Sequence, residues 1–134
     1  MAAHEHLNPT QLRDHVRSHL KNWPESYDTP DCANGNCWHA TRGYIGSAVE
    51  AGHEAIFQTH EVPDDVHVSH HPTHTVAQVQ TSRGPYVVDL THRQFDAKAP
   101  YPLIEPIHKF LGRKTMKPFR YVDEFTLEDL ENLD

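Results

Sequence analysis

Two short runs of alternating residues constrain the fold of this chain more than any other feature. The first is His74-Thr75-Val76-Ala77-Gln78-Val79-Gln80, and the second is Pro85-Tyr86-Val87-Val88-Asp89. Such alternation is typical of β-strands, whose side chains point to opposite faces in turn. The segment between them, Thr81-Ser82-Arg83-Gly84, ends in a glycine at a turn position that requires a positive φ. We therefore expect a β-hairpin with Gly84 in its turn.

The spacing of His74 and Asp89 predicts that both side chains lie on one face of this hairpin. The two residues are 15 positions apart, and opposed residues across a hairpin with an even-length loop have odd separations. With Thr81 to Gly84 as the loop, they are diagonal neighbours within side-chain reach. Asp89 follows an apolar run, so we expect its carboxylate to be buried and to need a partner such as an imidazole N–H.

The chain before the hairpin carries helical patterns. Asn8 is a favourable N-cap, Pro9 suits the first helical position, and this first helix is expected to end at Trp23-Pro24. Its apolar stripe consists of residues spaced four apart: Leu12, Val16 and Leu20. The stretch from Glu25 to Asn36 is rich in Pro, Asp, Asn and Gly, and we expect a loop there.

A second helix is expected from about Cys37 to Ala51. Its buried face is predicted at four residues: Ile45, Ala48, Val49 and Gly52. Gly43 and Gly46 each cost roughly 1 kcal/mol relative to alanine inside a helix. Their presence suggests close packing against another element.

The remaining patterns are shorter. We expect strands at Ala55–His60 and Phe119–Val122, a mostly irregular stretch from Phe95 to Pro106, and a last helix, Leu127–Leu133, capped by Thr126. This order of elements predicts an α+β fold in which N-terminal helices pack on an antiparallel β-sheet. The 134 residues are expected to form a single domain, residues 1–134.

Composition excludes several classes of function. A net charge of −7 argues against a nucleic-acid-binding protein, which needs a basic face. No apolar run is long enough for a transmembrane helix, and residues 1–6 lack the apolar region of a secretory signal peptide. Two cysteines cannot make a disulfide scaffold, so a reducing compartment is the expected location. Mean hydropathy is −0.72, but the apolar residues are periodic, which indicates a folded chain.

Cys37 lies at the expected start of the second helix, in the segment Asn34-Gly35-Asn36-Cys37-Trp38. A helix N-terminus and a neighbouring imidazolium both favour the thiolate form of a cysteine. Cys37, His74 and Asp89 therefore supply the parts of a thiol nucleophile, its base and the residue that orients the base.

The segment around Cys37 also offers groups that would meet a substrate. The backbone N–H of Cys37 is a candidate oxyanion donor, and the side-chain amide of either Asn34 or Asn36 is a second one. Gly35 carries no Cβ, so a substrate backbone is able to approach closely. Trp38 is a candidate substrate-binding residue.

Cys32 is the competing cysteine. It lies in the middle of the expected loop, between Asp31 and Ala33, where no partner activates it, and we expect a partly buried structural thiol. A disulfide between Cys32 and Cys37 that switches activity off is an open alternative.

A metal site is a second alternative. Three crowded histidines, His67, His70 and His71, precede His74, and Cys32, Cys37 and His39 lie upstream. Zinc sites use such residues, but the chain has no Cys-x-x-Cys pair, no His-Glu-x-x-His helix and no zinc-deaminase signature. We therefore expect neither a metal nor another cofactor, and we expect residues 67–71 to form a solvated loop.

Three segments resemble the papain-like-fold toxin and effector domains, a family that includes protein glutamine deamidases of bacterial toxins and effectors. They are Asn36-Cys37-Trp38, His74-Thr75-Val76-Ala77-Gln78-Val79 and Val88-Asp89-Leu90-Thr91-His92-Arg93-Gln94-Phe95-Asp96. The family uses Cys, His and Asp in this order. The resemblance, over residues 35–106, implies a papain-like catalytic core with Cys37 as nucleophile, His74 as base and Asp89 as orienter. It also implies a structural role for Arg93-Gln94-Phe95, with Phe95 in the core and Gln94 bonded to backbone.

The expected activity is hydrolysis of a carboxamide through a thioester, and the resemblance favours deamidation of a glutamine in an unidentified protein substrate. A cysteine protease or isopeptidase and a transglutaminase share the same thioester, so both stay open. A catalytically inactive papain-like binding protein also stays open; its acidic segment, residues 123–134, would then contact a basic partner. The expected location is the cytoplasm, or the cytosol of a target cell.

Overall fold

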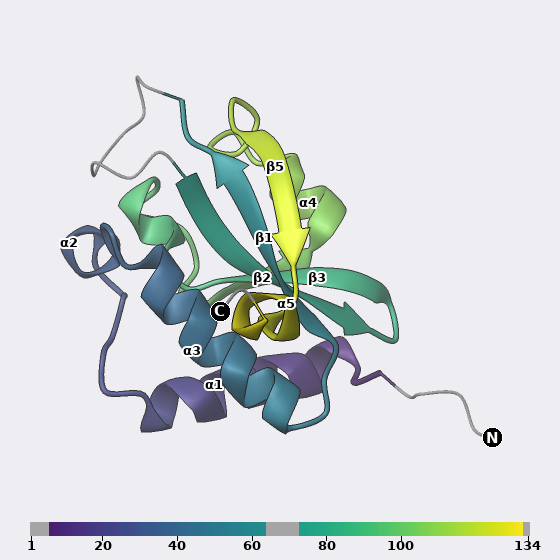
Figure 1. The fold of residues 1–134 in the computed structure, drawn as a ribbon. Coiled ribbons are helices and arrows are strands. Elements are labelled where there is room, and N and C mark those ends of the chain that lie inside the picture. Colours follow the sequence, from purple (N-terminus) through teal and green to yellow (C-terminus); the bar gives the residue numbers. More distant parts are fainter. Residues whose placement is uncertain (1–5, 64–72, 133–134) are drawn as a thin grey trace.

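The structure is a computed structural model that describes residues 6–63 and 73–132. Its helices are α1 (Pro9–Asn22), α2 (Pro30–Ala33), α3 (Cys37–Glu50), the 3-10 turn η2 (His92–Gln94), α4 (Ile107–Leu111) and α5 (Leu127–Glu131). Its strands are β1 (Ala55–Glu61), β2 (Thr73–Thr81), β3 (Gly84–Asp89), β4 (Leu103–Pro106) and β5 (Arg120–Phe125). Figure 1 shows α1 and α3 side by side below the sheet, with α4 at some distance from both.

The described strands form one antiparallel sheet in the order β4-β3-β2-β1-β5. This confirms the mixed helix-and-strand class and the antiparallel sheet expected from the sequence. The predicted hairpin is β2 and β3: Thr81 pairs with Gly84 and Ala77 with Val88, and Gly84 has φ +95°. The register therefore makes His74 and Asp89 diagonal neighbours, as the spacing predicted.

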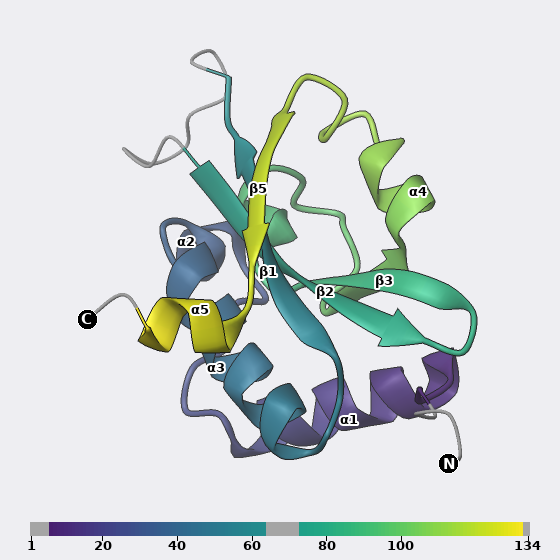
Figure 2. The ribbon, with the colours of Figure 1, turned by 45° about the vertical axis from the view of Figure 1, so that its right-hand side comes forward.

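Both faces of the sheet are covered, because consecutive strand residues enter two different cores. Ala77 and Val88 join the larger core, to which α1 and α3 contribute Leu12, Val16, Ala40, Tyr44, Ile45 and Ala48. Val76 and Val87 join a second core with Phe110 of α4 and with Met116 and Phe119. Figure 2 shows α1 and α3 on one side of the strands and α4 on another. His74 is two residues from Val76, so its side chain lies on the face of the second core.

The helices α1 and α3 begin at the residues that the sequence predicts, Pro9 and Cys37. The side chain of Asn8 accepts a hydrogen bond from the Gln11 backbone N–H, and Pro9 is the first residue of α1. Gly43 on α3 makes the expected close approach: a Cβ there would lie 2.4 Å from the Trp23 indole. The expectation for Gly46 is wrong, since a Cβ at that position would meet nothing within 4 Å.

Two local expectations are also wrong. Residues 25–36 are not a continuous loop, because Thr29 accepts a hydrogen bond from the Cys32 N–H and Pro30 occupies the first helical position, which starts α2. The stretch from Phe95 to Pro106 is mostly irregular, as expected, and its last four residues form β4, which pairs with β3. Val49 is 44% exposed and does not belong to the buried face of α3.

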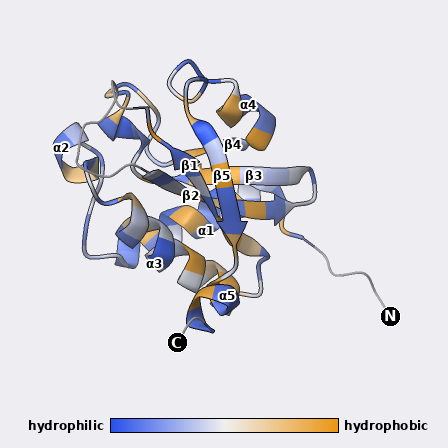
Figure 3. Ribbon diagram, turned by 45° about the horizontal axis from the view of Figure 1, so that its top comes forward, coloured by the Kyte–Doolittle hydropathy of each residue, from blue (hydrophilic) through white to orange (hydrophobic). Residues whose placement is uncertain are grey.

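The C-terminal part agrees with its expected strand and helix. β5 is an edge strand that is largely exposed, and much of it is coloured as hydrophilic in Figure 3. Thr126 caps α5 through a capping box with Asp129. No helix in the described part of the chain combines the length and the apolarity that a membrane crossing requires.

Candidate active site

Cys37 is the first residue of α3, at the helix end where the backbone N–H groups point outward. It is 7% exposed, and its thiol lies 3.9 Å from the carbonyl oxygen of Thr73, the first residue of β2. One turn further along α3, the Thr41 hydroxyl donates a 3.0 Å hydrogen bond to the Thr75 carbonyl. These two contacts anchor the start of α3 to the start of β2, the strand that carries His74.

His74 and Asp89 form a buried pair across the hairpin. The Nε2 atom of His74 lies 2.7 Å from Oδ2 of Asp89, and neither side chain is exposed to solvent. Because the negative carboxylate only accepts hydrogen bonds, the ring donates from Nε2. Its other nitrogen, Nδ1, is buried and has no hydrogen-bond partner within the described residues. Nδ1 is thus the atom of His74 that remains for proton exchange with Cys37.

The electrostatics of the trio favour a thiolate–imidazolium pair. Burial raises the pKa of the Cys37 thiol, but the neighbouring His74 and the Thr75 backbone lower it more, so the net direction is downward. Burial likewise lowers the pKa of His74, while Asp89 and Cys37 raise it to about 10. For Asp89, burial raises the pKa, and the charge and hydrogen bonds of His74 and His92 hold it well below its usual range.

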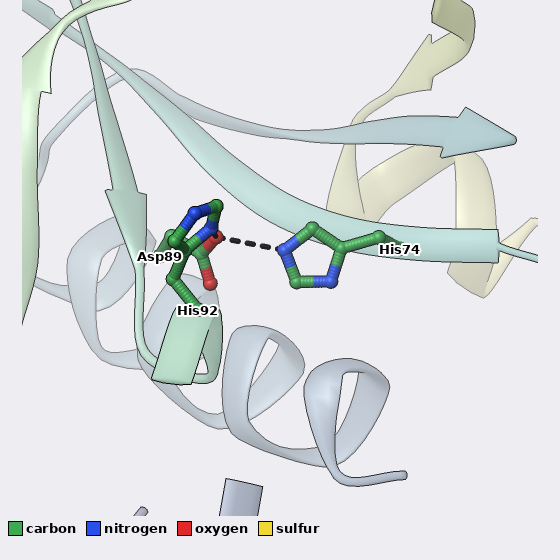
Figure 4. Close-up of side chains that lie close together, drawn as sticks. All are labelled: His74, Asp89 and His92. Atoms are coloured by element: carbon green, nitrogen blue, oxygen red, sulfur yellow. Dashed lines mark hydrogen bonds and ion pairs between the residues drawn. The ribbon is translucent and has the colours of Figure 1, made fainter. Parts of the chain in front are cut away.

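His92 is a member of this site that the sequence reasoning missed. Its Nδ1 lies 2.9 Å from Oδ2 of Asp89, and its Nε2 lies 2.7 Å from the hydroxyl of Thr115. Figure 4 shows His92 beside Asp89, with His74 approaching the same carboxylate from β2. The available signal was its position three residues after Asp89, within the segment that resembles the family.

The residues expected to face a substrate differ in whether their side chains are already hydrogen-bonded. The side-chain amide of Asn36 donates a 2.7 Å hydrogen bond to the Cys32 carbonyl and is therefore occupied. Asn34 is exposed, and its side chain has no hydrogen-bond partner among the described residues. The first turn of α3 has no side-chain cap, which leaves its N–H groups available. Trp38 is 40% exposed and stacks on Phe57 with a ring separation of 5.1 Å.

Cys32 differs from its expected environment. It lies in α2 rather than in a loop, and it is exposed rather than partly buried. Both cysteines are free thiols, so the structure has no disulfide between Cys32 and Cys37.

One group of described residues has ligand atoms close enough together to surround a metal ion: His74, Asp89 and His92. The hydrogen bonds above account for this closeness, because both rings donate to the same carboxylate oxygen. The histidines of residues 67–71 lie outside the described part of the chain. His39 is exposed and lies 3.5 Å from the Glu25 carboxylate.

The segment after Asp89 packs against the site through Phe95. Phe95 is partly buried and packs against the His74 ring at 4.8 Å, as expected for a core residue. The expectation for Gln94 is wrong, because its side-chain amide donates to the Thr91 hydroxyl and not to backbone. The short η2 turn brings that hydroxyl within its reach.

Comparisons of the chain with protein-family models, with curated proteins and with solved structures found no match.

Proposed function

We propose that this protein is a cysteine-dependent amide hydrolase with a papain-like core. The observation that carries the proposal is the orientation of His74, whose Nε2 is bound to Asp89 while its buried Nδ1 makes no hydrogen bond, together with the lowering of the Cys37 pKa by His74. A base with one nitrogen held by a carboxylate and the other directed at the nucleophile is the arrangement of a Cys-His-Asp triad.

The chemistry proceeds in two steps. The Cys37 thiolate attacks the carbonyl carbon of the amide, a C–S bond forms, and the C–N bond breaks as His74 gives its Nδ1 proton to the leaving nitrogen. Water then attacks the thioester, His74 accepts a proton from the water, and the carboxylic acid leaves as the thiolate is regenerated. Asp89 stays a carboxylate throughout and stabilises the imidazolium form of His74.

The developing negative oxygen needs hydrogen-bond donors. The backbone N–H of Cys37 and the other uncapped N–H groups of the first turn of α3 supply one side. Of the two asparagines, Asn34 is the better second donor, because Asn36 is already bound to Cys32. Exposed Trp38 offers an aromatic surface for the substrate next to the nucleophile.

A glutamine side chain of a protein is the substrate that we favour, on the strength of the resemblance to toxin and effector deamidases. A protease or isopeptidase would release a peptide amine from the same thioester, and a transglutaminase would transfer the acyl group to an amine. The free thiols support activity in a reducing cytosol, that of the cell itself or of a target cell.

Alkylation of the two cysteines tests the proposal. Iodoacetamide labelling is followed by mass spectrometry over a pH series, with Cys32 as the internal control. Exposure alone predicts faster labelling of Cys32, because Cys32 is exposed and Cys37 is buried. We expect the reverse at neutral pH, and we expect the preference for Cys37 to disappear in His74→Ala. Equal labelling, or faster labelling of Cys32, would contradict the proposal and favour an inactive binding protein.

The acyl acceptor is identified in a second assay. Proteins from a cell lysate are incubated with the wild type and with Cys37→Ala, and ammonia release and glutamine-to-glutamate conversion are measured. Deamidation that depends on Cys37 is the expected result. Peptide cleavage would indicate a protease, and incorporation of an added primary amine would indicate a transglutaminase.

A further inference from the structure

His92 has both ring nitrogens engaged in the interior of the protein. It is 1% exposed, and its ring lies 5.8 Å from that of Phe95 and 5.9 Å from that of Phe110. Nδ1 contacts Asp89 Oδ2 at 2.9 Å and Nε2 contacts the Thr115 hydroxyl at 2.7 Å. Both polar atoms of this buried ring are therefore satisfied, and one of the two partners is the carboxylate that also binds His74.

We propose that His92 is a positioning residue of the Cys37-His74-Asp89 site, which holds the Asp89 carboxylate in the orientation that His74 requires. The inference rests on the proposed function and deepens it. His92 does not reach the nucleophile; it acts through Asp89.

The hydrogen bonds around Asp89 show how this positioning works. Oδ1 accepts from the backbone N–H of Thr91 at 3.0 Å, and Oδ2 accepts from both His74 and His92. A carboxylate held by three donors in a buried site cannot rotate without leaving one of them unpaired. His92 supplies the second side-chain donor to Oδ2, in addition to His74.

Asp89 and Thr115 together hold His92 in the tautomer that this role needs. A neutral imidazole has one donor nitrogen and one acceptor nitrogen. The carboxylate of Asp89 only accepts hydrogen bonds, so the proton of His92 is on Nδ1, and Nε2 then accepts from the Thr115 hydroxyl. These hydrogen bonds link Thr115, His92, Asp89 and His74.

Two other titratable groups interact electrostatically with these residues without a hydrogen bond to Asp89. His60 of β1 pairs in register with His74, and burial lowers its pKa to about 4, so it stays neutral near neutral pH. Arg113 acts on its own neighbour, since it makes a bidentate pair with Glu105. Neither group forms a hydrogen bond with Asp89, so His92 remains its side-chain donor besides His74 in the described structure.

Two amides at position 92 test the proposal as a matched pair. The amide nitrogen of His92→Asn occupies roughly the place of Nδ1 and is able to donate to Asp89, whereas that of His92→Gln reaches toward Thr115 in place of Nε2. The readout is the pH midpoint and the neutral-pH rate of Cys37 alkylation. We expect His92→Gln to raise the midpoint and to slow labelling roughly tenfold or more, the value of a hydrogen bond to a charged group. His92→Asn should stay within about threefold of the wild type.

Thr115→Val is an independent variant that leaves His92 in place. Loss of the hydroxyl frees the tautomer of His92, so we expect a smaller upward shift of the same midpoint, and Thr115→Ser should restore it. If both His92→Gln and Thr115→Val keep the wild-type midpoint while wild-type Cys37 is reactive, His92 has no positioning role and the proposed function stands. If wild-type Cys37 labels no faster than Cys32, the proposed function fails, and the role of His92 fails with it.

Discussion

At the scale of single residues, Asp89 is the most demanding position of the candidate site. Its carboxylate is buried and accepts hydrogen bonds from three donors: His74 Nε2, His92 Nδ1 and the Thr91 backbone N–H. Removal of the negative charge leaves these donors facing a group that satisfies them poorly, and a buried unsatisfied donor is costly. The functional and the structural roles of Asp89 are therefore coupled.

Asp89→Asn separates the charge of this side chain from its shape. We expect Cys37 alkylation at neutral pH to slow at least tenfold or so, because His74 loses the carboxylate that raises its pKa. The free energy of unfolding should fall by about 1–3 kcal/mol. Alkylation kinetics and urea unfolding measure both effects, with exposed Asp14→Asn as the control. An unchanged alkylation rate in Asp89→Asn would rule out the imidazolium role of His74.

At the scale of elements, the contact between α3 and the end of α1 depends on Gly43 and not on Gly46. A Cβ at Gly43 would lie 2.4–2.9 Å from three carbons of the Trp23 ring, and Trp23 is held by a hydrogen bond from its indole N–H to the Tyr27 hydroxyl. A Cβ at Gly46 meets nothing within 4 Å.

Alanine at these two positions should have opposite effects. Gly43→Ala must displace the Trp23 ring, and we expect a loss of about 1–3 kcal/mol in the free energy of unfolding. Gly46→Ala should stabilise the protein by up to about 1 kcal/mol, because only the helix propensity changes. Urea unfolding of the two variants provides the comparison, and equal effects would show that α3 does not pack on Trp23.

Three partly buried histidines on α1 and just after α3 favour the folded state when their rings are neutral. Burial lowers the pKa of His15, His19 and His53, and the His15 and His53 rings lie 4.6 Å apart. Each therefore binds fewer protons in the folded state than in the unfolded state. The stability that this contributes is present above the unfolded pKa of about 6.5 and is lost as the pH falls through the folded values.

We therefore expect the melting temperature to fall as the pH decreases below about 6.5. Replacement of His15 by glutamine, which cannot be protonated in this range, should make the decrease shallower. Thermal melts between mildly acidic and neutral pH measure the slope. Substitution of exposed His39 is the matched control. An acid slope that is identical in His15→Gln and in the wild type would contradict this origin.

At the scale of the whole molecule, the trio couples three separate elements, α3, β2 and β3, through proton binding. The raised pKa of His74, about 10, contributes stability that is complete below about 6.5 and is lost as the pH rises through 10. The lowered pKa of Cys37 acts in the opposite direction, because its contribution grows with pH up to the unfolded thiol value of about 8.5. The two dependences offset each other between these limits.

Wild-type stability should therefore change less with pH between about 6.5 and 8.5 than His74 alone would make it change, and should fall above that range. In Cys37→Ser the thiol contribution is absent, so the decline should begin near pH 6.5. Melting temperatures across this range test the difference, with Cys32→Ser as the control. The same alkaline profile in the wild type and in Cys37→Ser would show that no thiolate–imidazolium pair forms.

Much of the architecture was predictable because its signals are local. The cap at Asn8, the turn at Gly84 and the alternation of β2 and β3 report backbone dihedral preferences within a few residues. The sequence did not reveal α2 or β4, each only four residues long. The formation of α2 depends on the cap at Thr29, and the formation of β4 depends on pairing with β3. Both segments are rich in proline and have no periodicity from which a helix or a strand could be inferred.

The sequence by itself determined that His74 and Asp89 share a face of one hairpin, because alternation and turn length leave no other register that suits both strands. Only the tertiary structure decided which other groups join them. Cys37 comes from a helix that packs on the opposite face, and Thr115 lies 23 residues beyond His92. Contacts at such separations depend on how two cores close around one sheet, and no local pattern in the chain records that packing.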